Sequence, residues 1–197
     1  MLNINLDKVI GIVINSRWAS QIAFPHREFL DLVVAYRIPV LLPGDSVAYR
    51  LVTDDLLEGS VITEEMLYEA AVKNYRGQIH TMTAMFHLLG HEMDPSPYDS
   101  NMYVLTNPGV QFGAFGITQI AILDDHARWL HSDLAIIPSS IHELIIFPFN
   151  KDIASWMVEY VPSVNQEQVD PVDVLSDNMY VYRRDSKAVE IWKEKFA

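Results

Sequence analysis

A hydroxyl, an imidazole and a carboxylate stand close together in Pro138-Ser139-Ser140-Ile141-His142-Glu143. In hydrolases such groups act as the nucleophile, its general base and the acid that orients the base. Members of a triad usually meet through folding, however, and sequence neighbours seldom point toward one another. On a strand, Ser140 and His142 share one face and Glu143 points away. The segment therefore also fits a tight reversal in which Ser139 or Ser140 caps the backbone and His142 pairs locally.

The chain offers few partners for this segment. It contains no Gly-x-Ser-x-Gly elbow, the strand-to-helix turn that presents a nucleophilic serine. A hydrolase would use His142 with Ser139 or Ser140, with His26 or Asn107 brought near by folding. The residues alone leave open whether the protein is an enzyme.

Three histidines, His80, His87 and His91, follow a helical spacing. On one continuous helix they would lie within about 20° of a single line, where imidazoles can bind a transition metal. Glu92 or Asp94 would add an oxygen ligand. The His-Glu-x-x-His spacing of metalloproteases is absent, and the helix is expected to end before His91. We therefore predict no metal and no cofactor, with these three histidines as the candidates should a metal bind.

Two further patterns have structural explanations. Adjacent carboxylates in Asp124-Asp125-His126 diverge by about 100° on a helix, which is typical of a solvated surface rather than of an acid–base pair. The glycines of Phe112-Gly113-Ala114-Phe115-Gly116 lack the third glycine of a nucleotide-binding loop, and no Gly-Lys-Ser/Thr follows. They predict a bulge or a close approach of the backbone in an apolar strand. The tryptophans are expected in the core or at an interface: Trp18, Trp129, Trp156 and Trp192.

The elements that must position these residues alternate between strands and helices. Hydrophobic periodicity predicts helices over 5–22, 63–74, 78–89 and 121–131, and one from 153 that Pro162 ends or breaks. Short apolar runs predict strands over 29–42, 47–52, 102–106, 112–120, 134–137, 144–149, 179–183 and 189–192. Hairpins alternating with single helices favour an α+β fold with a largely antiparallel sheet.

The length of 197 residues fits a single α+β domain over 1–197. Within it we expect lobes 1–92 and 101–197, joined by a 93–100 loop. Pro95 and Pro97 deny that loop regular hydrogen bonding, so it is the expected flexible connector.

Charge and composition exclude several classes of partner. The chain carries 14 Lys and Arg against 26 Asp and Glu, a net charge of −12. This balance argues against nucleic acid and against an anionic membrane, because both are bound mainly through Lys and Arg. No Lys or Arg occurs between Arg76 and Arg128, so that stretch is buried or presents an acid-only surface. The absence of cysteine excludes disulfides and thiolate metal sites, and we expect a cytoplasmic location.

Four stretches of the chain carry a resemblance to a known family. They are Pro25–Leu32, Tyr103–Asn107 followed by Gly113-Ala114, Ile137–Ile145, and a tail with Val164-Asn165, Val169, Pro171, Val174–Asp177 and Tyr180. Together they resemble the bacterial domain-of-unknown-function family 5688, chiefly its C-terminal two-thirds. Its members often carry further residues in front, and the histidine stripe is not part of its pattern. The family has no established activity, so the resemblance implies no catalytic role for any residue.

These observations lead to one prediction and one alternative. We predict a non-catalytic domain that acts through protein contacts, with a protein partner or a second copy of itself and without nucleic acid or membrane. The alternative is a hydrolase-like enzyme that uses His142 with Ser139 or Ser140.

Overall fold

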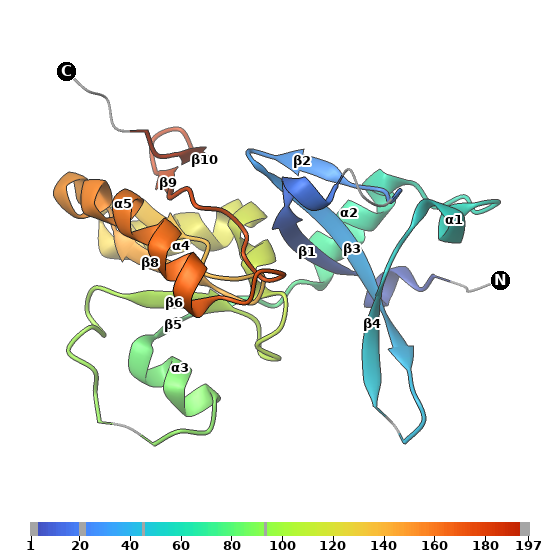
Figure 1. Cartoon of the computed structure of the whole chain (residues 1–197), viewed down its shortest axis with the longest axis horizontal. Coiled ribbons are helices and arrows are strands. Elements are labelled where there is room, and N and C mark those ends of the chain that lie inside the picture. Colours follow the sequence, from blue (N-terminus) through green and yellow to red (C-terminus); the bar gives the residue numbers. More distant parts are fainter. Residues whose placement is uncertain (1–3, 20–22, 45, 93, 194–197) are drawn as a thin grey trace. The chain divides into compact units, whose positions relative to one another are not determined.

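The computed structural model describes residues 4–19, 23–44, 46–92 and 94–193, and the chain divides into two compact units. Unit 1 is Met1–Arg76 and unit 2 is Gly77–Ala197. Each unit contains its own antiparallel sheet (Figure 1), which confirms the α+β class. The division differs from the expected lobes, because β5 (Gln78–Thr81) pairs with β6 (Tyr103–Thr106) and so places residues 77–92 in unit 2. No helix among the described residues is long and apolar enough to cross a membrane.

Unit 1 is organised around one long strand, β3 (Leu32–Leu41), with which every other strand of its sheet pairs antiparallel. Helix α2 (Glu64–Asn74) confirms the helix predicted over 63–74, and the Thr63 hydroxyl caps its start by accepting from the Met66 amide. It buries Leu67, Ala70 and Ala71. The remaining elements are η1 (Leu6–Lys8), β1 (Ile10–Asn15), η2 (Ser16–Trp18), β2 (Arg27–Phe29), β4 (Val47–Leu51) and α1 (Asp54–Leu57).

The helix predicted over 5–22 is wrong. Its central part is strand β1, which pairs with β3 from Ile10 opposite Arg37 to Asn15 opposite Leu32. Ile and Val are β-branched and favour a strand, and they fill most of β1. Residues 20–22 of the predicted helix lie outside the described residues.

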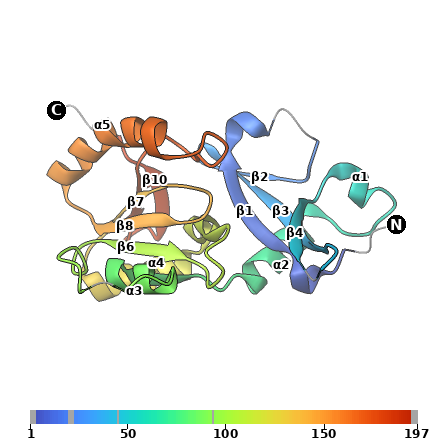
Figure 2. The same cartoon turned by 60° about the horizontal axis from the view of Figure 1, so that its bottom comes forward.

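Unit 2 contains a six-stranded sheet in the order β10-β9-β7-β8-β6-β5, in which every neighbouring pair is antiparallel (Figure 2). The predicted strands before and after the Ser-His segment, and the predicted C-terminal hairpin, are confirmed. Besides β5 and β6, the elements are α3 (Met82–Leu88), η3 (Gly113–Thr118), α4 (Ile120–Leu130), β7 (Leu134–Ile137), β8 (Leu144–Pro148), α5 (Lys151–Gln168), β9 (Tyr180–Arg183) and β10 (Ala188–Ile191).

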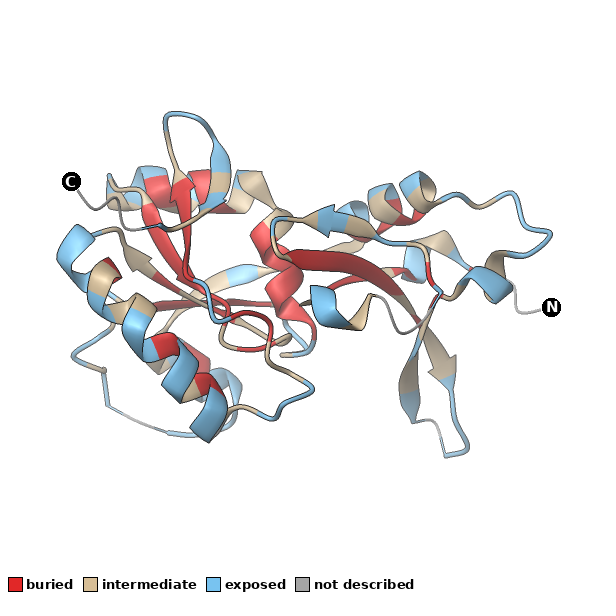
Figure 3. Cartoon of the chain, turned by 45° about the horizontal axis from the view of Figure 1, so that its top comes forward, coloured by how far each residue is buried: buried red, intermediate tan, exposed pale blue. Residues whose placement is uncertain are grey.

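The two faces of this sheet bury different helices, because side chains alternate along each strand. On β7, Ala135 and Ile137 belong to the core cluster that α5 covers with Ala154 and Val161. On the other face, the Tyr182 hydroxyl of β9 bonds with α4. The inner strands β6, β7 and β9 are largely buried, the outer strands β5 and β10 are not, and α5 is buried along one side only (Figure 3).

Three predicted elements of unit 2 differ in the structure. The strand predicted over 112–120 is instead the 3-10 helix η3 (Gly113–Thr118), followed by the start of α4 at Ile120. A short apolar run such as 112–117 does not distinguish strand from helix when its residues are buried. The helix predicted over 78–89 begins only at Met82, because residues 78–81 are held in β5. Helix α5 continues through Pro162, where Asn165 bonds to the Ser176 carbonyl and the Asp177 carboxylate.

Candidate functional site

The Ser-His segment forms the reversal between β7 and β8. The hydroxyl of Ser139 donates to Glu143 Oε1 at 2.9 Å, and that of Ser140 donates to the same oxygen at 2.8 Å. Ser140 Oγ also accepts from the amide of His142 at 3.0 Å. Each hydroxyl has one proton to donate, and both are directed to Glu143. The structure therefore brings the serines to the carboxylate and not to the imidazole.

The ring of His142 is held between two other segments. Its Nδ1 accepts from the Phe112 amide at 3.3 Å, and its Nε2 lies 3.8 Å from the Asp173 carboxylate. The carbonyl of His142 accepts from the Gly113 amide and the Thr106 hydroxyl, each at 2.9 Å. With Nδ1 already occupied, neither serine hydroxyl bonds to the imidazole ring of His142, and this is the contact on which the hydrolase hypothesis depends.

Substitution of His142 by alanine is expected to lower stability. It removes the acceptor of the Phe112 amide and the contact with Asp173, at a cost of about 1 kcal/mol. Thermal unfolding followed by circular dichroism should show a lower Tm than for the wild type. The exposed His91 provides the matched control, and His91→Ala should leave the Tm near the wild-type value. An unchanged Tm for His142→Ala would contradict the structural role.

The two residues that folding was expected to add have local roles. His26, in unit 1, bonds through Nδ1 with the Phe24 carbonyl at 2.8 Å. Asn107, in unit 2, accepts from the amides of Gly109 and Gln111 and donates to the Gln111 carbonyl, so it stabilises the turn after β6.

The histidine stripe is divided among different elements. His80 lies on β5, His87 lies on α3, and His91 follows the end of that helix. Because Thr81 caps α3 through the Ala84 amide, the three histidines do not share one helix. Across the described ranges, no three or more His, Asp or Glu side chains are grouped so that they could hold a metal ion.

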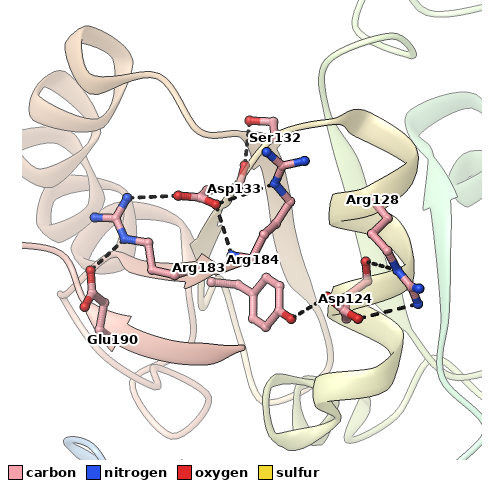
Figure 4. Close-up of polar contacts among 8 residues, drawn as sticks. Asp124, Arg128, Ser132, Asp133, Arg183, Arg184 and Glu190 are labelled. Atoms are coloured by element: carbon pink, nitrogen blue, oxygen red, sulfur yellow. Dashed lines mark hydrogen bonds and ion pairs between the residues drawn. The ribbon is translucent and has the colours of Figure 1, made fainter. Parts of the chain in front are cut away.

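A charge network connects α4 with the β9–β10 hairpin (Figure 4). Asp124 accepts from the Tyr182 hydroxyl at 2.9 Å and pairs with Arg128 and Lys187, and Asp133 pairs with Arg183. The Tyr182 hydrogen bond, together with these cations, holds the pKa of Asp124 below its usual value. Burial and Asp124 raise the pKa of Tyr182 to about 12. Sequence spacing could not reveal this network, because its members are up to 63 positions apart.

An apolar pocket of about 540 Å³ lies between α5, the sheet and the loop before β6. Helix α5 forms one wall with side chains spaced three or four residues apart: Ile153, Trp156, Met157, Tyr160, Val161 and Val164. The sheet contributes Ile137, Ile145 and Phe147. The loop contributes Tyr98, Asn101 and Met102.

The loop wall is tied to α3 by polar contacts. The amide of Thr83 donates to Asp99 Oδ1 at 2.8 Å, and the amide of Ser96 donates to Thr83 Oγ1 at 2.7 Å. Hydrogen bonds from Thr83 lower the pKa of Asp99, so its carboxylate is charged at neutral pH. The 93–100 segment was expected to be the flexible connector, and these contacts hold its described residues to α3.

Large apolar side chains at the mouth of the pocket remain open to solvent. Tyr98 is 61% exposed, Trp156 54%, Tyr160 49% and Ile153 47%. The rings of Trp156 and Tyr160 stack with centroids 4.8 Å apart. Monomeric proteins rarely leave contiguous apolar surface uncovered without a binding role. The sequence did not predict this site. The signal that could have revealed it is the spacing of apolar residues by three and four along α5, which continues past Pro162 to Val164.

Comparison with known proteins places the chain among proteins without an assigned activity. Residues 6–184 match the family of unknown function DUF5688. No curated protein and no solved structure matches the chain.

Proposed function

Since the chain belongs to DUF5688, a family whose function is unknown, we propose its function from its own geometry. Unit 2 is a non-catalytic protein-interaction domain. Its apolar pocket, lined by α5, the sheet and the 98–102 loop, receives apolar side chains from a segment of a partner protein.

The single observation that carries this proposal is the stacked, half-exposed pair of Trp156 and Tyr160 at the mouth of the pocket. Trp and Tyr are the residue types that most often dominate binding energy at protein interfaces. A site that sequesters a small molecule encloses most of that molecule's surface. Here the apolar surface continues outward onto exposed Tyr98 and Ile153, which supports a partner larger than the pocket.

The proposal extends to the surroundings in which the domain works. A net charge of −12 supports function without nucleic acid, and the absence of cysteine is consistent with the cytoplasm of a bacterium.

Selection of peptides on the full chain tests the proposal. The probe is a displayed library of random peptides about 12 residues long, the length of helix that matches α5 from Ile153 to Val164. Enriched peptides should share apolar residues spaced three or four apart, and one of them, synthesised, should bind in isothermal titration calorimetry. Trp156→Ala should weaken that binding at least about tenfold, because this exposed ring contributes contact area without supporting the core.

Trp129 provides the matched control, since it is a tryptophan of unit 2 that is 64% exposed and does not line the pocket. Trp129→Ala should bind the peptide as the wild type does. The proposal fails if no peptide is enriched, or if Trp156→Ala and the wild type bind equally. If sedimentation shows that the wild type is a dimer and that Trp156→Ala is a monomer, the pocket serves self-association and the proposal of a separate partner protein fails.

A further inference from the structure

We infer that the partner segment is a basic amphipathic helix, with Lys or Arg beside the apolar side chains that enter the pocket. This inference rests on the proposed function and specifies the chemistry of the partner.

The pairing of the strands under the pocket disfavours recognition by strand addition. Strand β7 pairs with β8 and β9, and β8 pairs with β7 and β6. Ile137, Ile145 and Phe147 therefore contribute side chains from inner strands of the sheet. Because a partner strand adds to an exposed edge of a sheet, we expect the partner to bind here through its side chains. An amphipathic helix laid along a groove binds in this manner.

The dimensions of the α5 wall set the length of that helix. From Ile153 to Val164 the wall extends about 16 Å, which is three helical turns. A partner helix of equal length presents apolar residues at positions i, i+4 and i+7 toward one face. This spacing of apolar residues on the partner helix matches the spacing of the apolar residues on α5, which are also three or four residues apart.

Acidic residues stand next in sequence to residues on both walls of the pocket, close enough for their charge to act on a bound partner at low salt. Each of four acidic residues is the sequence neighbour of a pocket-lining residue: Asp99 beside Tyr98, Asp152 beside Ile153, Glu159 beside Tyr160, and Asp170 beside Val169. Asp152, Glu159 and Asp170 are exposed. Within the part of the chain that the structure describes, no Lys or Arg forms an ion pair with any of the four.

The basic residues of unit 2 are mostly engaged elsewhere. Arg128, Arg183, Arg184 and Lys187 pair with the carboxylates of the α4 and β9–β10 network (Figure 4). The stretch from residue 77 to 127, which supplies the loop wall, contains no Lys or Arg at all. On α5 itself, Lys151 is the single basic residue. The pocket is thus apolar within, and acidic residues outnumber basic ones along the segments that form its walls. A partner with apolar side chains flanked by Lys or Arg complements both properties.

The test uses one enriched peptide in three versions that keep its apolar residues and carry Lys, Ser or Glu at the flanking positions. At low salt the Lys version should bind about tenfold more tightly than the Ser version, and the Glu version should bind most weakly. Salt at about 0.5 M should remove most of this difference, since it screens exposed charges. The double variant Asp152→Asn with Glu159→Gln should reduce the advantage of Lys. Asp185→Asn, an exposed carboxylate at the β9–β10 turn, should leave it unchanged.

The outcomes separate this inference from the function on which it rests. If all three versions bind equally and Trp156→Ala weakens each of them, the inference is overturned and the protein-interaction function stands. If none of the versions binds, both are overturned. If the Lys advantage persists undiminished in the double variant, the carboxylates at the pocket are not its cause and the inference fails.

Discussion

Replacement of Gly113 by alanine is expected to destabilise unit 2 by more than about 3 kcal/mol. A Cβ at this position would lie 2.5 Å from the His142 carbonyl oxygen, 2.5 Å from Thr106 Oγ1 and 2.6 Å from Thr106 Cα. The Gly113 amide also donates to that carbonyl at 2.9 Å, so the two backbones cannot separate without losing the bond. Urea unfolding followed by tryptophan fluorescence measures the loss.

Gly109 supplies the matched control from the same region of the chain. A Cβ there would find Asn107 Oδ1 at 3.5 Å, which is ordinary contact, so Gly109→Ala should change the free energy of unfolding by less than about 1 kcal/mol. Equal stability of the two variants would show that η3 does not need to approach the His142 backbone so closely.

In unit 1, Glu64→Ala is expected to cost about 2 kcal/mol, because it leaves a buried hydroxyl without its acceptor. Tyr36 is fully buried and its hydroxyl donates to Glu64 Oε1, while Arg27 donates to Glu64 Oε2 at 2.9 Å. In a Tyr36→Phe background, Glu64→Ala should lower the free energy of unfolding by less, because no hydroxyl is left without its acceptor. Glu65 also pairs with Arg27 but is 63% exposed, so Glu65→Ala should cost under about 1 kcal/mol.

The contribution of Glu64 to the stability of the fold should decrease as the pH is lowered. Burial opposes its ionisation, but hydrogen bonds from Arg27 and Tyr36 outweigh burial and lower the pKa of Glu64. A carboxyl whose pKa is lower in the folded state stabilises the fold above its unfolded-state pKa and loses this effect as it is protonated. The stability difference between the wild type and Glu64→Gln should therefore shrink as the pH falls below about 4. A difference that stays constant down to pH 2 would contradict this assignment.

The sequence predicted those elements whose conformation is set by residues close to them in the chain. The helix predicted over 63–74 is α2, which begins where the Thr63 side chain caps it, and the strand predicted over 102–106 contains β6. The glycine pattern at 113–116 correctly indicated a close backbone approach at Gly113, although in a helix rather than a strand. The secondary structure of β1 and β5 depends on partners 17 to 28 residues away, and periodicity does not report such pairings.

The candidate pocket could not be predicted either, because it too depends on contacts between residues distant in the sequence. Pro162 removes one helical hydrogen bond and normally marks the end of a helix. In α5 the burial of Val161 and the bonds of Asn165 to residues 176 and 177 hold the helix together past that point. Trp156 and Tyr160 become a site only when the sheet and the 98–102 loop are placed against them. The Ser-His segment, by contrast, has a recognisable sequence pattern, but its side chains form hydrogen bonds that stabilise the reversal between β7 and β8.

The strand order of unit 2 has a consequence for how the protein forms during synthesis. All the strands of unit 1 leave the ribosome before residue 77, so its sheet can form while the rest is translated. In unit 2, β7 lies between β8 and β9, and β9 begins only at Tyr180. Until then β7, whose four residues are buried in the finished protein, presents an open apolar edge. An unpaired apolar edge of this kind is prone to aggregation until its partner strand is made.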